Sequence, residues 1–127
     1  MKKQTILYVS RIRQYKFMAG YTTMNIFEKQ IQECTPLAVE FKSALPENEI
    51  LNSATSTVTA KDVNGVDKSS TLIFGIEVIN ETMLKCKILA AGTADNDYMV
   101  TFKGVTLPSA YVIEENVLLR IRDETLV

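Results

Sequence analysis

Few residues in this 127-residue chain have side chains suited to chemistry: two cysteines and two short acidic clusters stand out. Histidine, the most common general base and metal ligand, is absent. A Ser-His-Asp or Cys-His arrangement is therefore impossible. The five glycines are scattered and form neither a GxGxxG nor a GxxxxGK[ST] phosphate loop. The usual routes to nucleophilic catalysis and nucleotide binding are not available to this sequence.

The acidic clusters are the remaining candidates. Asp95-Asn96-Asp97 has the oxygen-rich character of a calcium loop but lacks the glycine and the distal glutamate of an EF-hand. A solvated turn before a strand is the favoured interpretation. Glu114-Glu115 could supply paired carboxylates for acid–base catalysis, but neighbours in an extended chain point to opposite faces. The sequence therefore predicts a protein that is not an enzyme and that needs no metal or cofactor.

The cysteines, Cys34 and Cys86, belong to no CxxC pair. A short apolar run, Ile6-Leu7-Tyr8-Val9, follows Lys2-Lys3, but a secretory signal needs roughly 7–15 apolar residues. No stretch approaches the roughly 18 apolar residues of a membrane span. We therefore expect a protein made and kept in a cytoplasm, where both cysteines would be free thiols. A disulfide between them is the alternative.

Charge divides the chain into two unequal parts. Residues 1–27 carry five basic residues and no acid, whereas all fifteen acids lie beyond them with nine basic residues, a net charge of −6. Such asymmetry indicates two pieces with different roles. We expect an extended basic N-terminal arm over residues 1–26 and one domain over residues 27–127.

The arm is the predicted docking element. Three aromatic residues are interleaved with its charges, and the residues expected to dock are Lys2, Lys3, Tyr8, Arg11, Arg13, Tyr15, Lys16 and Phe17. Aromatic and basic residues together are typical of single-strand nucleic-acid binders, which is one alternative. A leader preceding a later start at Met18 or Met24 is another. We favour a segment that orders against a protein partner by adding a strand to a neighbouring sheet edge.

The rest of the chain has the two-residue period of β-strands. We expect an all-β, Ig-like β-sandwich of about seven short antiparallel strands, because turn signals recur every 8–12 residues. Two turns are expected at Asp62-Val63-Asn64-Gly65 and over 104–109, a bulge is expected at Gly75, and residues 110–116 could be strand or turn. Strands are expected over 37–41, 50–60, 71–79, 84–88, 98–103 and 117–122.

This pattern resembles a family of small bacteriophage virion proteins, the fibre-tail adaptor proteins. Phe27-Glu28-Lys29-Gln30-Ile31-Gln32-Glu33 is similar to the start of such chains, with Ile31-Gln32 in place of the usual Pro-Gly. Ile50-Leu51-Asn52-Ser53-Ala54-Thr55 is similar to their threonine-rich strand. The loop Ala91-Gly92-Thr93 before the tyrosine-led strand Tyr98–Phe102 and the closing strand over 116–123 complete the pattern, although the second glycine usual in that loop is missing.

The resemblance implies a non-catalytic virion structural protein that connects portal, neck or tail proteins to fibres. It implies several copies, arranged in a ring, in a particle assembled in the host bacterial cytoplasm. It brings no catalytic residues, no membrane contact and no role for nucleic acid. A capsid decoration or carbohydrate-binding module of a virion is the alternative, for which Tyr111 is the residue to watch because the chain has no tryptophan.

Overall fold

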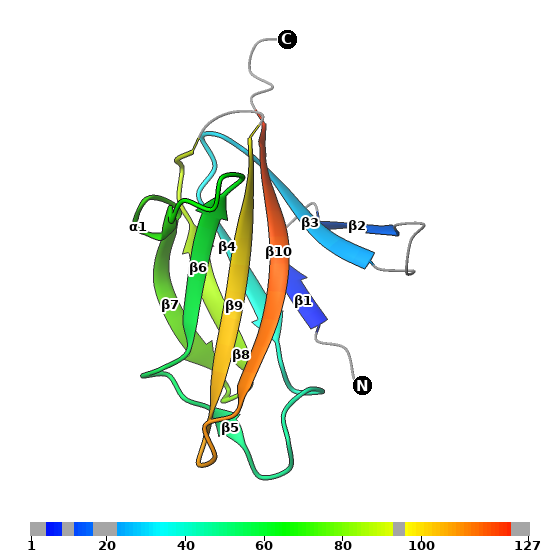
Figure 1. The fold of residues 1–127 in the computed structure, drawn as a ribbon, viewed down its shortest axis with the longest axis vertical. Helices are drawn as coiled ribbons and strands as arrows, with labels where there is room; N and C mark the ends of the chain where they lie inside the picture. Colours follow the sequence, from blue (N-terminus) through cyan, green and yellow to red (C-terminus); the bar gives the residue numbers. More distant parts are fainter. Residues whose placement is uncertain (1–4, 9–11, 17–22, 93–95, 123–127) are drawn as a thin grey trace.

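The computed structural model of the chain describes residues 5–8, 12–16, 23–92 and 96–122, with the backbone alone for those before Asn25. These residues form ten strands and one short helix (Figure 1). In chain order they are β1 (Thr5–Tyr8), β2 (Ile12–Lys16), β3 (Thr23–Gln30), β4 (Thr35–Glu40), β5 (Ile50–Leu51), β6 (Thr57–Asp62), α1 (Ser69–Leu72), β7 (Ile73–Ile79), β8 (Met83–Ile88), β9 (Asp97–Leu107) and β10 (Val112–Arg122).

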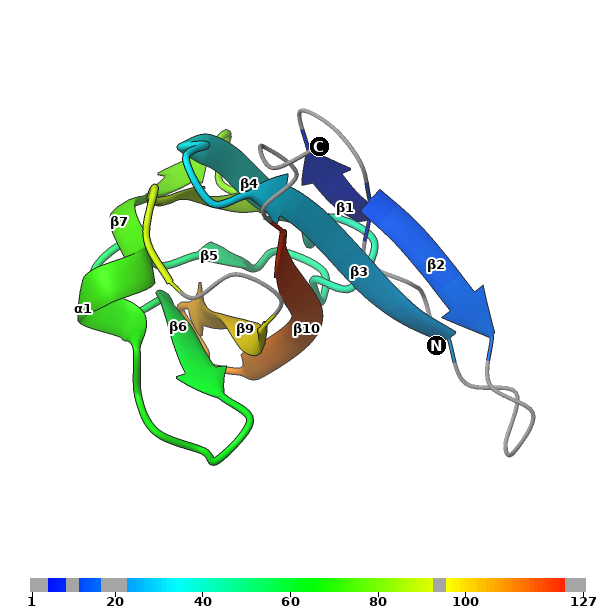
Figure 2. The ribbon, with the colours of Figure 1, turned by 90° about the horizontal axis from the view of Figure 1, so that it is seen from above.

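The strands form two sheets, which confirms the prediction of an all-β sandwich. One sheet has the order β1-β4-β8-β7, and the other has the order β2-β3-β10-β9, with β5 and β6 both paired to β9. Figure 2 shows the two layers from above, with β2 and β3 extending to one side. The order of β1, β4, β8 and β7 is that of strands A, B, E and D in an immunoglobulin sandwich, and β6, β9 and β10 correspond to C, F and G.

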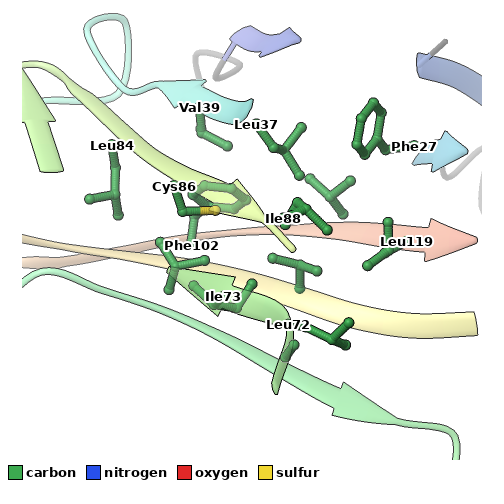
Figure 3. Packing of buried hydrophobic residues seen from close by; sticks show 14 of the residues in the cluster. Phe27, Leu37, Val39, Leu72, Ile73, Leu84, Cys86, Ile88, Phe102 and Leu119 are labelled. Atoms are coloured by element: carbon green, nitrogen blue, oxygen red, sulfur yellow. The ribbon is translucent and has the colours of Figure 1, made fainter. Parts of the chain in front are cut away.

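The core lies between the two sheets because alternate residues of each strand point inward. On β8, Leu84, Cys86 and Ile88 are buried, and Figure 3 shows them pointing toward Phe102 and Leu119 of the opposite sheet. The in–out alternation predicted for these strands is confirmed. Burial raises the pKa of the Cys86 thiol to about 12, so this cysteine behaves as a neutral apolar group. Both cysteines are free thiols.

The prediction of about seven antiparallel strands is wrong in two respects. The structure describes ten strands, and one pair of neighbouring strands is parallel. β3 runs parallel to β10, with Phe27 opposite Leu119, and only then continues through a turn into β4. Parallel pairing leaves no periodicity signal different from that of antiparallel pairing, so the sequence pattern could not reveal it. The last two strands, β9 and β10, are also long, with 11 residues each.

Two stretches expected to be single strands are divided. The predicted strand over 50–60 is interrupted after β5 because the Asn52 side chain accepts a hydrogen bond from the Ala54 N–H at 2.9 Å. The Asn52 carbonyl also accepts one from Ser56 N–H at 2.9 Å, so the chain turns before β6. The predicted strand over 71–79 begins instead with α1, and β7 follows from Ile73.

Gly75 and Gly104 have different roles in their strands. The bulge predicted at Gly75 is confirmed, because the pairing of β7 with β8 shifts between Phe74 and Glu77 and Gly75 has φ of +65°. The connection predicted over 104–109 is wrong, since β9 continues to Leu107. Gly104 is a buried strand residue, and a Cβ there would lie 2.8 Å from Leu51 Cδ2. Its lack of a side chain makes room for β5 rather than forming a turn.

Candidate functional site

The most distinctive surface is the tip of the β9–β10 hairpin, residues 106–112, at the lower end of Figure 1. Three apolar side chains there are unusually open to solvent: Leu107 is 42% exposed, Tyr111 54% and Val112 56%. The turn between them contains a cis peptide bond between Leu107 and Pro108, and Ala110 has φ of +58°. Clustered exposed apolar groups on a soluble domain commonly mark an interaction site.

A single carboxylate fixes the backbone of this tip. Glu49, in the connection between β4 and β5, accepts three hydrogen bonds. Its Oε1 accepts from Thr106 Oγ1 at 2.7 Å and from Ser109 N–H at 3.0 Å, and its Oε2 accepts from Ser109 Oγ at 3.1 Å. Loss of solvent raises the pKa of the Glu49 carboxyl, but these hydrogen bonds outweigh it and hold the pKa below its ordinary value.

Thr106 links Glu49 to the backbone of Tyr111 through hydrogen bonds. The Thr106 side chain is fully buried, and its hydroxyl donates to Glu49 while accepting from the Tyr111 N–H at 2.9 Å. The Thr106 N–H donates to the Tyr111 carbonyl at 2.9 Å, and the Ala110 N–H donates to the Thr106 carbonyl at 3.0 Å. The backbone that presents the exposed side chains is therefore held from both sides, which lowers the entropy lost when they bind.

The surroundings of the tip are acidic. β5 pairs with the end of β9, and the Leu51 N–H donates to the Glu81 carbonyl at 2.8 Å, so three segments meet here: 40–51, 80–82 and 102–116. Together these segments contain six glutamates and two lysines, a net charge of −4. They hold most of the −6 found beyond residue 27. Apolar groups surrounded by carboxylates favour a partner with an apolar surface and a basic margin.

Three of these glutamates form no ion pair within the described residues, although Glu114 lies opposite Lys103 in the pairing of β10 with β9. Glu47, Glu81 and Glu114 are exposed, and none forms an ion pair with any residue that the structure describes. Glu115 differs, because its side chain is half-buried and burial raises the pKa of its carboxyl against the hydrogen bond from Asn116 N–H. The two neighbours therefore lie in different environments, as expected for adjacent residues of a strand.

The described parts of the predicted arm pair with strands of both sheets. β1 pairs with β4 in one sheet, with Tyr8 opposite Leu37, and β2 pairs with β3 in the other. Arg13, Tyr15 and Lys16 thus lie on β2 and Tyr8 on β1, so the structure does not bring them together on one strand. The remaining predicted arm residues, Lys2, Lys3, Arg11 and Phe17, lie outside the described residues.

The other end of the sandwich contains a cavity of about 330 Å³ beside the turn after β6. Its lining residues include Asp62, Lys68 and Asn96. The Asp62 carboxylate there already accepts hydrogen bonds from Asn64 N–H and Val66 N–H, both at 2.9 Å, and these hold the turn. The turn expected over 62–65 is confirmed, and the Asp62 carboxylate holds its backbone through Oδ1.

The predicted acidic cluster at 95–97 is only partly described, since Asp95 lies outside the described residues. Asp97 starts β9 and forms a two-pronged ion pair with Arg120, with Nε to Oδ1 at 2.9 Å and Nη2 to Oδ2 at 3.0 Å. No group of three or more metal-ligating side chains occurs within the described ranges. Within the same ranges, no helix has the length and apolar character that a membrane span requires.

Sequence reasoning identified Tyr111 but not the residues that hold it. Tyr111 was singled out only for the carbohydrate-binding alternative, because the chain has no tryptophan. Glu49 lies 60 residues from its partner Ser109, and an isolated glutamate in a polar turn looks like any other. No protein-family model, curated protein or solved structure matches this chain. The resemblance to fibre-tail adaptor proteins therefore remains a prediction from the residues.

Proposed function

We propose that this protein is a non-catalytic connector that joins other proteins in a bacteriophage particle, and that the β9–β10 tip is its docking surface. The observation that carries the docking part is the exposed Leu107, Tyr111 and Val112 on a backbone held by Glu49. A tyrosine on a rigid turn is a favourable anchor because few rotatable bonds are lost on binding.

The sandwich supports this role as a rigid spacer. The long strands β9 and β10 run the length of the domain, so the tip is separated from the opposite end by a packed core (Figure 1). A contact made at the tip is therefore transmitted to the rest of the body without a flexible joint. This is the mechanical property that a connector between two larger parts needs.

The other apolar surfaces support docking less well. Phe74 and Ile76 are exposed on the edge strand β7, but they flank the bulge at Gly75. A bulge interrupts the regular row of backbone groups that a partner strand would need. Val63 and Val66 are also exposed, on a turn at the opposite end, where the charges of residues 61–68 cancel.

The setting in a virion is supported by the resemblance of the sequence to fibre-tail adaptor proteins. The test uses particles purified from the host that produces this protein, with its gene replaced by variants. Tyr111→Ser with Val112→Asp changes the tip, and Val63→Ser with Val66→Asp changes exposed residues at the opposite end as a matched control. Quantitative mass spectrometry measures the copies of the protein in each particle.

We expect the tip variant to be largely lost from particles and the control to be incorporated at the wild-type level. Incorporation of both variants at the wild-type level would refute docking through the tip. Absence of the wild-type protein from purified particles would refute the virion setting itself. Circular dichroism of the purified variants shows that any loss does not come from unfolding.

A further inference from the structure

We propose that the acidic β9–β10 tip of one copy binds the basic N-terminal segment of a second copy of this chain. The proposal rests on the proposed docking role of the tip and names its partner. It begins from the distribution of charge, which the fold concentrates at the two places concerned. At the tip, exposed apolar side chains coincide with a net charge of −4 in the surrounding segments.

The first half of the contact is the tip end. The net charge of −4 in segments 40–51, 80–82 and 102–116 surrounds Leu107, Tyr111 and Val112. Glu47 and Glu114 supply exposed carboxylates there without ion-pair partners in the described chain. These carboxylates repel one another, so a basic partner would both neutralise them and cover the apolar groups.

The second half is the N-terminal segment. Residues 1–27 carry five positive charges, no acid, and an apolar and aromatic content that includes Tyr8, Tyr15 and Phe17. β2 is the outermost strand of its sheet, so one edge of its backbone has no neighbouring strand among those described (Figure 2). The segment thus offers the complementary charge together with apolar residues, at a sheet edge.

The two halves are different surfaces of the molecule, although β1 begins beside the tip end, with Thr5 opposite Glu40. A contact between two different surfaces of identical chains uses the tip of one copy and the N-terminal segment of the other, so the first copy keeps an unused segment and the second an unused tip. Further copies add to these unused halves. The contact would therefore produce a reciprocal pair, a closed ring or an open chain.

The test is self-association of the full chain, measured by sedimentation velocity from about 1 µM to about 100 µM, the range in which micromolar contacts become populated. We expect the average mass to rise with concentration at low salt. Raising the salt from about 0.05 M to about 0.5 M should reduce the association, because exposed charges are screened within a few ångströms at high salt. A protein that stays monomeric at every concentration in low salt would overturn the proposal.

Charge reversal tests the two halves separately. Glu47→Lys with Glu81→Lys and Glu114→Lys changes the net charge of the tip segments from −4 to +2, and Arg13→Glu with Lys16→Glu changes that of β2 from +2 to −2. Each variant alone presents two halves of like charge, so we expect its self-association to weaken by about tenfold or more. Glu77→Lys, an exposed glutamate on β7 away from the tip, is the control and should associate as the wild type does.

Mixing the two reversed variants is the decisive step. The basic tip of one then faces the acidic β2 of the other, and the converse contact also has opposite charges. We expect association to return in the mixture while each variant alone stays dissociated. Dissociation of the mixture, with both variants folded by circular dichroism, would overturn the proposal.

The outcome can be separated from that of the proposed function. A monomeric protein whose tip variant is nevertheless lost from particles would refute a second copy as the partner and leave docking through the tip intact. Self-association that is unchanged by reversal of the tip charges would refute this partner for the tip, whatever the particles contain.

Discussion

The two ends of the sandwich differ in whether their charged side chains have partners within the chain. At the end away from the tip, Arg120 pairs with Asp97 and Arg122 pairs with Glu28, whose Nε–Oε2 distance is 3.2 Å. Lys29 is buried there, and its ammonium group donates to the carbonyls of Gln30, Ile31 and Glu33. At the tip, exposed glutamates and apolar side chains have no such partners in the described chain. These charged groups of the far end have partners within the chain, whereas the exposed glutamates of the tip form no ion pair among the described residues.

Lys29 is a buried charged residue at the same end. Burial lowers the pKa of its ammonium group, although Glu33 and Cys34 act in the opposite direction. Three carbonyl acceptors satisfy all three donors of an ammonium group. The turn between β3 and β4 is thereby fixed by an almost fully buried charge, whereas the Glu49 carboxylate at the tip holds both the buried Thr106 and the exposed Ser109.

The largest expected effect on the free energy of unfolding comes from the buried part of β10, and its exposed start should contribute little. Leu119→Ala removes a fully buried side chain of β10 and should lower the free energy of unfolding by about 2–5 kcal/mol. Val112→Ala, on the exposed start of the same strand, should change it by less than about 0.5 kcal/mol. Urea denaturation of both variants measures the difference. Equal effects would mean that Val112 contributes to the core, contrary to the structure.

The next effect concerns the buried hydrogen bonds at each end. Thr106→Val removes the buried hydroxyl that joins Glu49 to the Tyr111 N–H and should cost about 1–3 kcal/mol of unfolding free energy. Lys29→Met should cost a similar amount, about 1–3 kcal/mol, because it leaves carbonyl groups without donors. Thermal denaturation measures both. We expect only Thr106→Val to change the amide NMR signals of Ser109 and Tyr111.

Much of the architecture, but little of the site, could be predicted from the sequence. The alternation of Leu84, Cys86 and Ile88 with lysines reported a half-buried strand, because burial on one face leaves a pattern of period two. The choice of strand partner leaves no such pattern. The parallel pairing of β3 with β10, and the pairing of β1 with β4 and of β2 with β3, could therefore not be inferred. Glu49 depends on a contact across 60 residues, which local sequence does not encode.

The N-terminal segment contributes a strand to each sheet, because β1 pairs with β4 and β2 pairs with β3. Removing residues 1–25 would delete both strands and the first three residues of β3, which starts at Thr23. It would expose an edge of β4 and of β3 to solvent. We expect this deletion to lower the midpoint of thermal unfolding and to promote aggregation, measured by light scattering. Unchanged solubility and stability would mean that these strands are dispensable to the fold.

The two cysteines extend the comparison to reactivity. Cys34 is exposed in the turn after β3, whereas Cys86 is buried with a pKa of about 12. A thiol-alkylating reagent at neutral pH should therefore modify Cys34 alone in the folded protein and both cysteines in denaturant, because the thiolate is the reactive form. Mass spectrometry counts the adducts. Rapid modification of Cys86 in the folded protein would show that the core opens easily.

The smallest expected effect is the response of the tip to acid. Because the pKa of Glu49 in the folded protein lies below its ordinary value, its contribution to stability is complete above the unfolded pKa of about 4.3 and is lost as the pH falls through the folded pKa. The amide signals of Ser109 and Tyr111 should thus shift only under acidic conditions. Glu49→Gln should remove this pH dependence, and its persistence in the variant would assign the shift to another group.

Docking through the tip is tested most directly by photocrosslinking in cells that produce the particle. A photoreactive phenylalanine analogue replaces Tyr111 at the tip or Val63 at the opposite end, where the side chain is 79% exposed. We expect illumination to join the protein through position 111 to one defined protein, a second copy or another virion component, and to yield no such product through position 63. Crosslinks from position 63 with none from position 111 would contradict the assignment of the docking surface.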